Sequence, residues 1–323
     1  MVTKPHLDDG HPDIFVTDDR MMVLTGGDHS VLDYCQGRAA PGADDIARFF
    51  DAIRQRSDWS TRRGIPYGYW VFPDKVIALG AKLAQRLGPV QSLFETHYRH
   101  APAWRDTCPV HYPLDQVAGQ ADAFPRTDTH YSDRGLVTLT AEVIDSVAPG
   151  QGAAFRTAAQ EARWGDKKIS GDLGVKFEPP VRERVDVLRL PIQPSVLNNG
   201  LSRNNGVMSL VECSQSQTDR TLLIFGDSFF RQMLPLLAWQ FRRIVFCRTQ
   251  FFHYELVEAL APDVILQGTA ERYLASYAGD AGRPHFLSYP FIRDNPMTPH
   301  KGFGPRFAAW FDQSKLTLGV PAP

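Results

Sequence analysis

Three short apolar runs in the last third of the chain constrain the fold most, because a segment of helical periodicity follows each of them. The runs are T-L-L-I-F at 221–225, R-I-V-F-C at 243–247 and D-V-I-L-Q at 263–267, and the segments after them span 229–241, 254–260 and 270–277. Strands this short and this apolar typically lie in the middle of a sheet that helices cover on both faces. The alternation therefore predicts an α/β fold around a central, mainly parallel sheet.

The same alternation begins nearer the N-terminus. Apolar spacing predicts a helix over 43–59, a buried strand over 67–72, a helix over 75–87 and another from a cap at Ser132 or Asp133 to about Val147. A chain of 323 residues is long enough for one large domain with an ample core. We expect that domain to span residues 1–280, with an irregular insertion near 149–206, and the tail 281–323 to pack on it.

A serine follows the first of the three runs directly, in the sequence Gly226-Asp227-Ser228. Ligands of open parallel sheets bind at the carboxyl ends of the strands, and Gly226 permits a tight turn there. The helix that follows directs free N–H groups and the positive end of its dipole toward the serine, an arrangement that stabilises an oxyanion. Taken alone, the motif is equally typical of an ordinary helix cap formed by Asp227 or Ser228.

The segment T-D-T-H at 127–130 supplies a candidate base for that serine. In an extended segment Asp128 and His130 point to the same side, so the carboxylate can reach the imidazole Nδ1 and leave Nε2 facing a nucleophile. Alone, this segment would be interpreted as a polar loop with an exposed histidine. Together with Ser228 it predicts a Ser-His-Asp triad, which forms whatever the order of its members along the chain.

At this point the sequence resembles a known family. G-D-S-F after an apolar strand is similar to the first block of the SGNH (GDSL) hydrolase superfamily. An Asp-x-His that precedes the serine resembles the alginate O-acetyltransferase branch (AlgJ/AlgX-like), in which the SGNH-like domain is circularly permuted. Four further segments agree in the same order: V-F-P-D-K at 71–75, F-P-R-T-D-T-H-Y-S-D-R-G at 124–135, I-S-G-D-L at 169–173 and A-P-D-V-I-L-Q-G-T-A-E-R-Y-L at 261–274. The resemblance covers roughly residues 20–276.

The resemblance implies a flavodoxin-like three-layer sandwich, with Ser228 as the acyl-accepting nucleophile, His130 as its base and Asp128 as the orienting acid. The Ser228 backbone N–H would supply one oxyanion donor. Candidates for further oxyanion or substrate contacts are Gly226 and Asp227 in the turn, Gln267 and Gly268 at the end of a neighbouring strand, and Tyr131, which stands where the family usually has tryptophan. Gln267 and Gly268 are equally typical of an ordinary strand end.

The expected function is that of a carbohydrate O-acetyltransferase that works through an acyl-serine. Its partners would be an acyl donor and a carbohydrate acceptor, with other polysaccharide-biosynthesis proteins as further candidates. Two alternatives stay open: a carbohydrate esterase or deacetylase on the same triad, and a catalytically silent module that binds glycan or scaffolds a complex.

Other classes of function are disfavoured. A formal net charge of −1 gives the protein no overall field toward nucleic acid. Neither G-x-G-x-x-G nor G-x-x-x-x-G-K-[ST] occurs, so we expect no cofactor. No apolar run approaches the ~20 residues of a membrane span. The first thirteen residues contain three acids and no apolar core of a secretory signal, which as written predicts a cytoplasmic protein, or a periplasmic one if the chain is a processed form.

One further group of residues suggests a metal. His97-x-x-His100 and Cys108-x-x-His111 offer four potential zinc ligands within fifteen residues. The seven-residue gap between the two pairs is short for a zinc finger, and Pro102 and Pro109 constrain the loop. We therefore expect no metal site.

Overall fold

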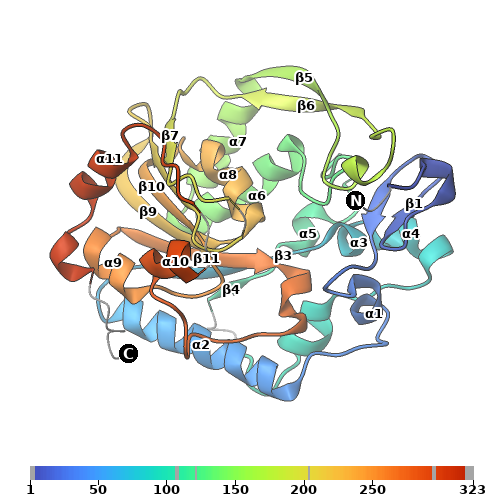
Figure 1. The fold of residues 1–323 in the computed structure, drawn as a ribbon, viewed down its shortest axis with the longest axis horizontal. Coiled ribbons are helices and arrows are strands. Elements are labelled where there is room, and N and C mark those ends of the chain that lie inside the picture. The colour runs from blue at the N-terminus through green and yellow to red at the C-terminus, as the bar shows by residue number, and fades with distance from the viewer. Residues whose placement is uncertain (1–3, 106–108, 121, 203, 293–295, 317–323) are drawn as a thin grey trace.

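The computed structural model describes residues 4–105, 109–120, 122–202, 204–292 and 296–316. Within them, the largest sheet has seven strands in the order β4-β3-β11-β9-β10-β8-β7 (Figure 1). These strands are β3 (Tyr67–Phe72), β4 (Val110–His111), β7 (Ser195–Asn198), β8 (Met208–Glu212), β9 (Thr218–Gly226), β10 (Phe241–Arg248) and β11 (Val264–Ala270). The pairs from β4 to β10 are parallel, whereas β8 and β7 are joined in antiparallel fashion. The predicted mainly parallel sheet is therefore confirmed.

Helices cover both faces of this sheet. The longer ones are α2 (Ala43–Thr61), α4 (Gly80–Leu87), α6 (Asp133–Val147), α7 (Gln151–Glu161), α8 (Ser228–Leu237) and α11 (Phe303–Trp310); α1 (Val31–Cys35), α3 (Lys75–Ala78), α5 (Leu114–Val117), α9 (Tyr254–Leu260) and α10 (Tyr289–Ile292) are shorter. Leu139 of α6 and Met233 of α8 pack with Ile224 on one face. Phe49 of α2 packs with Val71 on the other. The three-layer arrangement follows from strands that are apolar on both faces.

Three segments depart from the elements predicted for them. The predicted helix over 270–277 is a short 3-10 turn, Glu271–Ala275. The helix after Ser228 ends at Leu237 instead of running to 241, because β10 already begins at Phe241. The region 149–206 is more regular than expected: it holds α7, the antiparallel hairpin of β5 (Arg163–Ile169) and β6 (Glu183–Arg189), and β7. The hairpin escaped prediction because its mostly solvent-facing residues, such as R-W-G-D-K-K, carry no apolar alternation.

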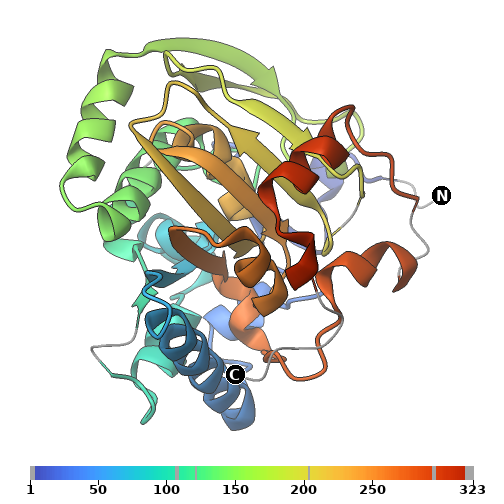
Figure 2. The same cartoon turned by 90° about the vertical axis from the view of Figure 1, so that its left-hand side faces the viewer.

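Two parts lie beside the main sheet. Figure 2 shows the β5–β6 hairpin outside the seven-stranded sheet, and β1 (Ile14–Val16) pairs with β2 (Met22–Leu24) in a second small ribbon. In the tail, Phe303 and Phe311 join a buried cluster that includes Leu223 and Val245 of the sheet. The division into one domain and a tail stays a prediction. Among the described residues, no helix is both long and apolar enough to span a bilayer.

Candidate active site

Ser228 stands at the carboxyl end of β9, the central strand between β11 and β10. Asp227 is the N-cap of α8, and its Oδ1 accepts a hydrogen bond of 2.8 Å from the Phe229 N–H. Its Oδ2 accepts a second one of 2.7 Å from the Ala270 N–H at the end of β11. Because Asp227 caps the helix, the hydroxyl of Ser228 is left for other chemistry.

The structure brings the three predicted triad residues into hydrogen-bond contact. His130 Nε2 lies 2.8 Å from Ser228 Oγ, and His130 Nδ1 lies 2.7 Å from Asp128 Oδ1. With a proton on Nδ1, the ring donates to Asp128 and its Nε2 can accept the serine proton. Ser228 is 6% exposed, so it lies just below the surface. This geometry fits a triad, and the catalytic roles stay predictions.

The aspartate is held in its charged form. Burial on its own would raise the pKa of Asp128, but hydrogen bonds from the ring and the backbone N–H of His130 outweigh burial and lower that pKa to about 2. A charged Asp128 favours the Nδ1–H tautomer of His130 and stabilises the imidazolium that forms when the base takes up a proton.

A second carboxylate, Asp172, lies beside this pair and was not singled out as a site residue from the sequence. Asp172 Oδ2 is 3.7 Å from His130 Nδ1, and the Asp172 N–H donates to Asp128 Oδ2 over 3.3 Å. Burial and the charge of Asp128 raise the pKa of Asp172. The G-D-L segment of the family resemblance contains this residue, so the motif was a usable signal. Asp172 fixes the outer oxygen of Asp128 through its backbone.

The loop that carries Asp128 and His130 is held by side chains from distant elements. The Lys75 ammonium, at the start of α3, donates to the carbonyl oxygens of Pro125, Arg126 and Asp128. Glu183, at the start of β6, accepts from the Arg126 N–H at 2.9 Å and the Thr127 N–H at 2.6 Å. Lys75 ends the V-F-P-D-K segment of the family resemblance but was given no role from the sequence, and Glu183 was not named there.

The family-like segments also contact one another. Asp74 and Arg272 form a buried ion pair, and the Arg272 N–H donates to Asp74 Oδ2 over 2.8 Å. The neighbouring Glu271 accepts from Ser92 Oγ at 2.7 Å, and burial raises its pKa to about 7. The V-F-P-D-K and E-R-Y-L segments therefore meet behind the site, where each contributes a buried charged residue.

Two glycines at the strand ends are explained by close packing. A Cβ on Gly268 would lie 2.5 Å from the Trp70 oxygen and 2.7 Å from Phe230 Cε2. A Cβ on Gly226 would lie 3.0 Å from Phe230 Cδ2 and 3.1 Å from the Gly268 oxygen. The absence of side chains lets β9, β11 and α8 approach one another just before Ser228.

The Gln267 side chain is held by three hydrogen bonds, and its oxyanion role stays a prediction. Its Nε2 donates to the Gln250 oxygen at 3.0 Å, and its Oε1 accepts from Arg56 at 3.0 Å and Tyr67 at 3.1 Å. Its oxygen accepts two hydrogen bonds and its nitrogen donates one, and 1% of the residue is exposed. The sequence could not show it, because Arg56 and Tyr67 lie some two hundred residues earlier.

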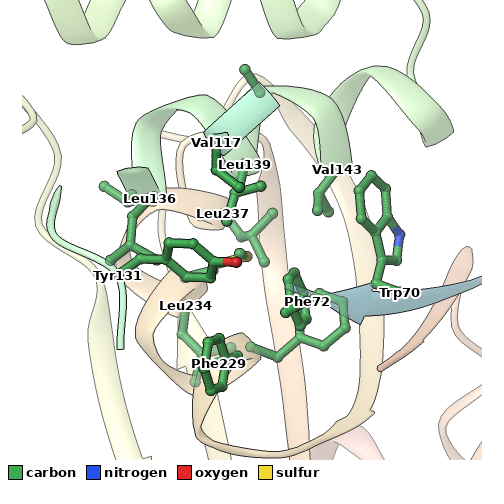
Figure 3. Close-up of a cluster of buried hydrophobic side chains, with 14 of the residues drawn as sticks. Trp70, Phe72, Val117, Tyr131, Leu136, Leu139, Val143, Phe229, Leu234 and Leu237 are labelled. Atoms are coloured by element: carbon green, nitrogen blue, oxygen red, sulfur yellow. The ribbon is translucent and has the colours of Figure 1, made fainter. Parts of the chain in front are cut away.

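Tyr131 is buried as well. It is 3% exposed, and its hydroxyl donates to the Pro73 oxygen over 2.6 Å. Figure 3 shows its ring among core side chains such as Leu136 and Phe229. This side chain anchors the residue after His130 in the core, and its expected contact with substrate stays a prediction.

A pocket of about 310 Å³ is lined by Gly226 and Asp227, the two residues that precede Ser228. The ends of β9, β10 and β11 form it, together with aromatic and amide side chains such as Tyr273, Tyr277 and Gln250. Arg248 lines one wall, and its guanidinium makes no ion pair or hydrogen bond with any residue that the structure describes. Burial and the nearby charge of Arg231 lower the pKa of Arg248.

Metal-ligating side chains gather at one place within the described ranges. Asp128, His130 and Asp172 each offer a ligand atom, and these atoms lie within 4.8 Å of one another. Asp128 is hydrogen-bonded to His130, and Asp172 is hydrogen-bonded to Thr129 and Asp128. Of the residues considered for zinc, His111 stacks on Trp70 with ring centroids 4.4 Å apart, and neither it, His97 nor His100 joins such a group. Cys108 lies outside the described residues.

No family model and no curated protein matches the sequence. Among solved structures, Bacillus cereus PatB1 aligns with a TM-score of 0.58 and 13% identity over 82% of this chain and 97% of that chain. PatB1 with a sulfonyl adduct aligns with a TM-score of 0.57 and 13% identity over 82% of this chain and 98% of that chain.

Two further solved structures align. A DHHW family protein from Eubacterium siraeum has a TM-score of 0.52 and 10% identity over 73% of this chain and 88% of that chain. The O-acetyltransferase domain of Pseudomonas putida AlgJ has a TM-score of 0.48 and 15% identity over 86% of this chain and 98% of that chain. It adds nothing to the conclusion on the fold. At these identities the likenesses establish the fold alone, and they agree with the predicted fold class.

Proposed function

We propose that this protein is an acyltransferase that moves an acetyl group onto a carbohydrate hydroxyl through an acyl-serine at Ser228. The observation that carries the proposal is the chain of contacts from Ser228 Oγ to His130 Nε2, at 2.8 Å, and from His130 Nδ1 to Asp128 Oδ1, at 2.7 Å. The order of the D-T-H and G-D-S motifs, and the segments that flank them, favour the O-acetyltransferase branch over other hydrolases of similar fold.

The first half-reaction forms the acyl-enzyme. His130 Nε2 takes the proton of Ser228 Oγ while Oγ attacks the carbonyl carbon of the acyl donor. The Ser228 backbone N–H, at the first turn of α8, would donate to the resulting oxyanion. Collapse of the tetrahedral intermediate breaks the bond to the leaving group, which takes the proton back from His130.

The second half-reaction consumes the acyl-serine. His130 Nε2 accepts the proton of a sugar hydroxyl, whose oxygen attacks the acyl carbon; collapse transfers the acyl group to the sugar and returns the proton to Ser228. Water in place of the sugar would give an esterase. The pocket beside Asp227 supports a carbohydrate acceptor, because aromatic rings and amide or hydroxyl groups, such as Tyr273, Gln250 and Thr249, suit a ligand rich in hydroxyls.

A solved structure of similar fold suggests a chemical probe for Ser228. PatB1 has been solved with a sulfonyl adduct. A sulfonyl fluoride reacts with an activated nucleophile by displacement of fluoride, so it would label Ser228 here if His130 activates that hydroxyl. The circular permutation is a part of the proposal that rests on motif resemblance.

The test is turnover of an activated acetyl ester with and without oligosaccharide acceptors. The proposal expects acetylated oligosaccharide from the wild type and none from Ser228→Ala. Release of acetate at the same rate whatever the acceptor would identify an esterase. No turnover and no sulfonyl labelling, with intact binding of glycan, would instead identify a silent binding module.

A further inference from the structure

The most unusual buried group outside the triad is the ammonium of Lys75. Lys75 is 3% exposed and lies at the N-terminus of the short helix α3. An ammonium has three N–H donors, and this one has three acceptors: the carbonyl oxygens of Pro125, Arg126 at 3.2 Å and Asp128 at 3.0 Å. No carboxylate of the described residues forms an ion pair with it. All three donors of the Lys75 ammonium therefore bind the loop 125–128.

That loop has almost no freedom left in its backbone. Its carbonyl groups at 125, 126 and 128 accept from Lys75. Its N–H groups at 126 and 127 donate to Glu183, and the Thr129 N–H donates to Asp172 over 2.7 Å. The Thr127 carbonyl accepts from Leu173 and Gly174. A cation therefore binds the carbonyl side of the loop, and two carboxylates bind the N–H side.

We propose that Lys75 is a positioning residue for the acyl transfer: its ammonium fixes the backbone on which Asp128 and His130 stand, and so keeps His130 aligned with Ser228. This inference rests on the proposed function. Lys75 contacts the loop that carries the base and not the reacting atoms, so its effect on the reaction is transmitted through the Asp128 carbonyl. A base displaced by about 1 Å can cost about 10²-fold in rate.

Because the contacts of Lys75 require its protonated form, the alignment of His130 with Ser228 should depend on pH. Burial lowers the pKa of Lys75 to about 7, although the charges of Glu183, Asp128 and Asp172 act to raise it, and Lys82 acts to lower it further. Below that pH the ammonium has three donors for three carbonyls. As pH rises through about 7, Lys75 loses one donor and its charge. The rate should then decline on the alkaline side.

Unfolding would not explain such a decline. The pKa of Lys75 in the folded protein is lower than its ordinary value of 10.5, so between the two values the unfolded chain binds more protons. Stability from this group therefore rises with pH across that window. Activity and stability should move in opposite directions there, which a merely structural lysine would not produce.

The experiment compares Lys75→Met, Lys75→Arg and the control Lys168→Met, which removes an exposed lysine of the β5–β6 hairpin. Rates of acylation by an activated acetyl ester are measured from about pH 5 to about pH 9, with the unfolding midpoint of each variant. Proton NMR of the His130 Nδ1–H provides a second readout that needs no turnover, since the hydrogen bond to Asp128 moves this resonance downfield.

We expect Lys75→Met to lower kcat by about 10²-fold with little change in KM. Its pH–rate profile should lose the decline on the alkaline side, and its His130 Nδ1–H resonance should shift or broaden. Lys168→Met should behave as wild type in all three respects. Lys75→Arg, which stays charged, should move the alkaline limb to higher pH. A Lys75→Met variant with a near-native rate, an unchanged alkaline limb and an unchanged resonance overturns the inference. If the wild type shows no acylation at all, the proposed function fails, while the NMR comparison still decides whether Lys75 positions His130.

Discussion

His130 Nδ1 lies 2.7 Å from Asp128 Oδ1, and the His130 backbone N–H donates to the same oxygen over 2.9 Å. One carboxylate oxygen thus accepts from both the ring and the main chain of the residue that it orients. The Asp-x-His spacing makes this double contact possible, because a turn of two residues brings the backbone N–H of the histidine under the aspartate side chain.

The first prediction concerns acid stability. The folded pKa of Asp128 is about 2, below its ordinary value of 3.8, so its contribution to stability is complete above that ordinary value and is lost as pH falls through about 2. The shift corresponds to about 2 kcal/mol. We expect the difference in unfolding free energy between wild type and Asp128→Asn, measured in urea, to shrink as pH is lowered from about 5 to about 2. A difference that does not depend on pH would contradict the assigned contacts.

The second prediction separates Tyr131 from the reaction. Tyr131→Phe removes the hydrogen bond to Pro73 and leaves the ring in the core, so we expect a loss of about 1 kcal/mol in unfolding free energy and a turnover within a few-fold of wild type. Tyr131→Ala should cost about 3–5 kcal/mol through the cavity it leaves. A Tyr131→Phe variant that loses glycan affinity but keeps its stability would support the substrate contact that the sequence suggested.

The third prediction tests the close approach of strands behind Ser228. Gly268→Ala places a methyl group 2.5 Å from the Trp70 oxygen, so we expect destabilisation of about 1–3 kcal/mol and slower acylation. Gly304→Ala is the matched control, because nothing lies within 4 Å of its Cβ and helix α11 continues through it. A Gly268→Ala protein as stable as the control would show that β11 can shift away from β3 at no cost.

Much of this fold could be predicted from the sequence. Strands such as 67–72 consist almost entirely of apolar and aromatic residues, and the run 221–225 is followed by a motif typical of a strand-to-helix turn. The pairing of T-D-T-H with G-D-S, together with the family resemblance, predicted that Ser228, His130 and Asp128 form a triad. Their contact was inferable because each lies at a position where local geometry dictates direction: a strand end, and an Asp-x-His segment.

The rest of the site was not inferable from local pattern. Lys75, Asp172 and Glu183 lie in three separate segments, and each forms hydrogen bonds with backbone groups of the loop 125–129, which leave no trace in composition or periodicity. The family-like segments V-F-P-D-K and G-D-L contain Lys75 and Asp172 but do not reveal these contacts. Gln267 was assigned to the oxyanion because it lies at a strand end, but its partner Arg56 on α2 determines where its amide points. The positions of these side chains depend on contacts between residues far apart in the sequence.

The fourth prediction concerns the acceptor. Arg248 lines the pocket beside Asp227 without an ion-pair partner among the described residues, so an acidic substituent on a glycan would find its charge available there. We expect Arg248→Gln to raise KM for an acidic oligosaccharide by about tenfold and to leave KM for a neutral one of equal length unchanged. An equal change in KM for both acceptors would show that Arg248 shapes the pocket but does not bind the acidic group.

The account rests most directly on the reactivity of Ser228. Wild type, Ser228→Ala and His130→Ala are incubated briefly with an activated acetyl ester, quenched in acid and analysed by intact mass and peptide mapping. We predict one added acetyl group on the wild type, located on Ser228, none on Ser228→Ala, and formation slower by several orders of magnitude on His130→Ala. Acetylation that persists in Ser228→Ala, or that proceeds at the wild-type rate without His130, would contradict the proposed triad.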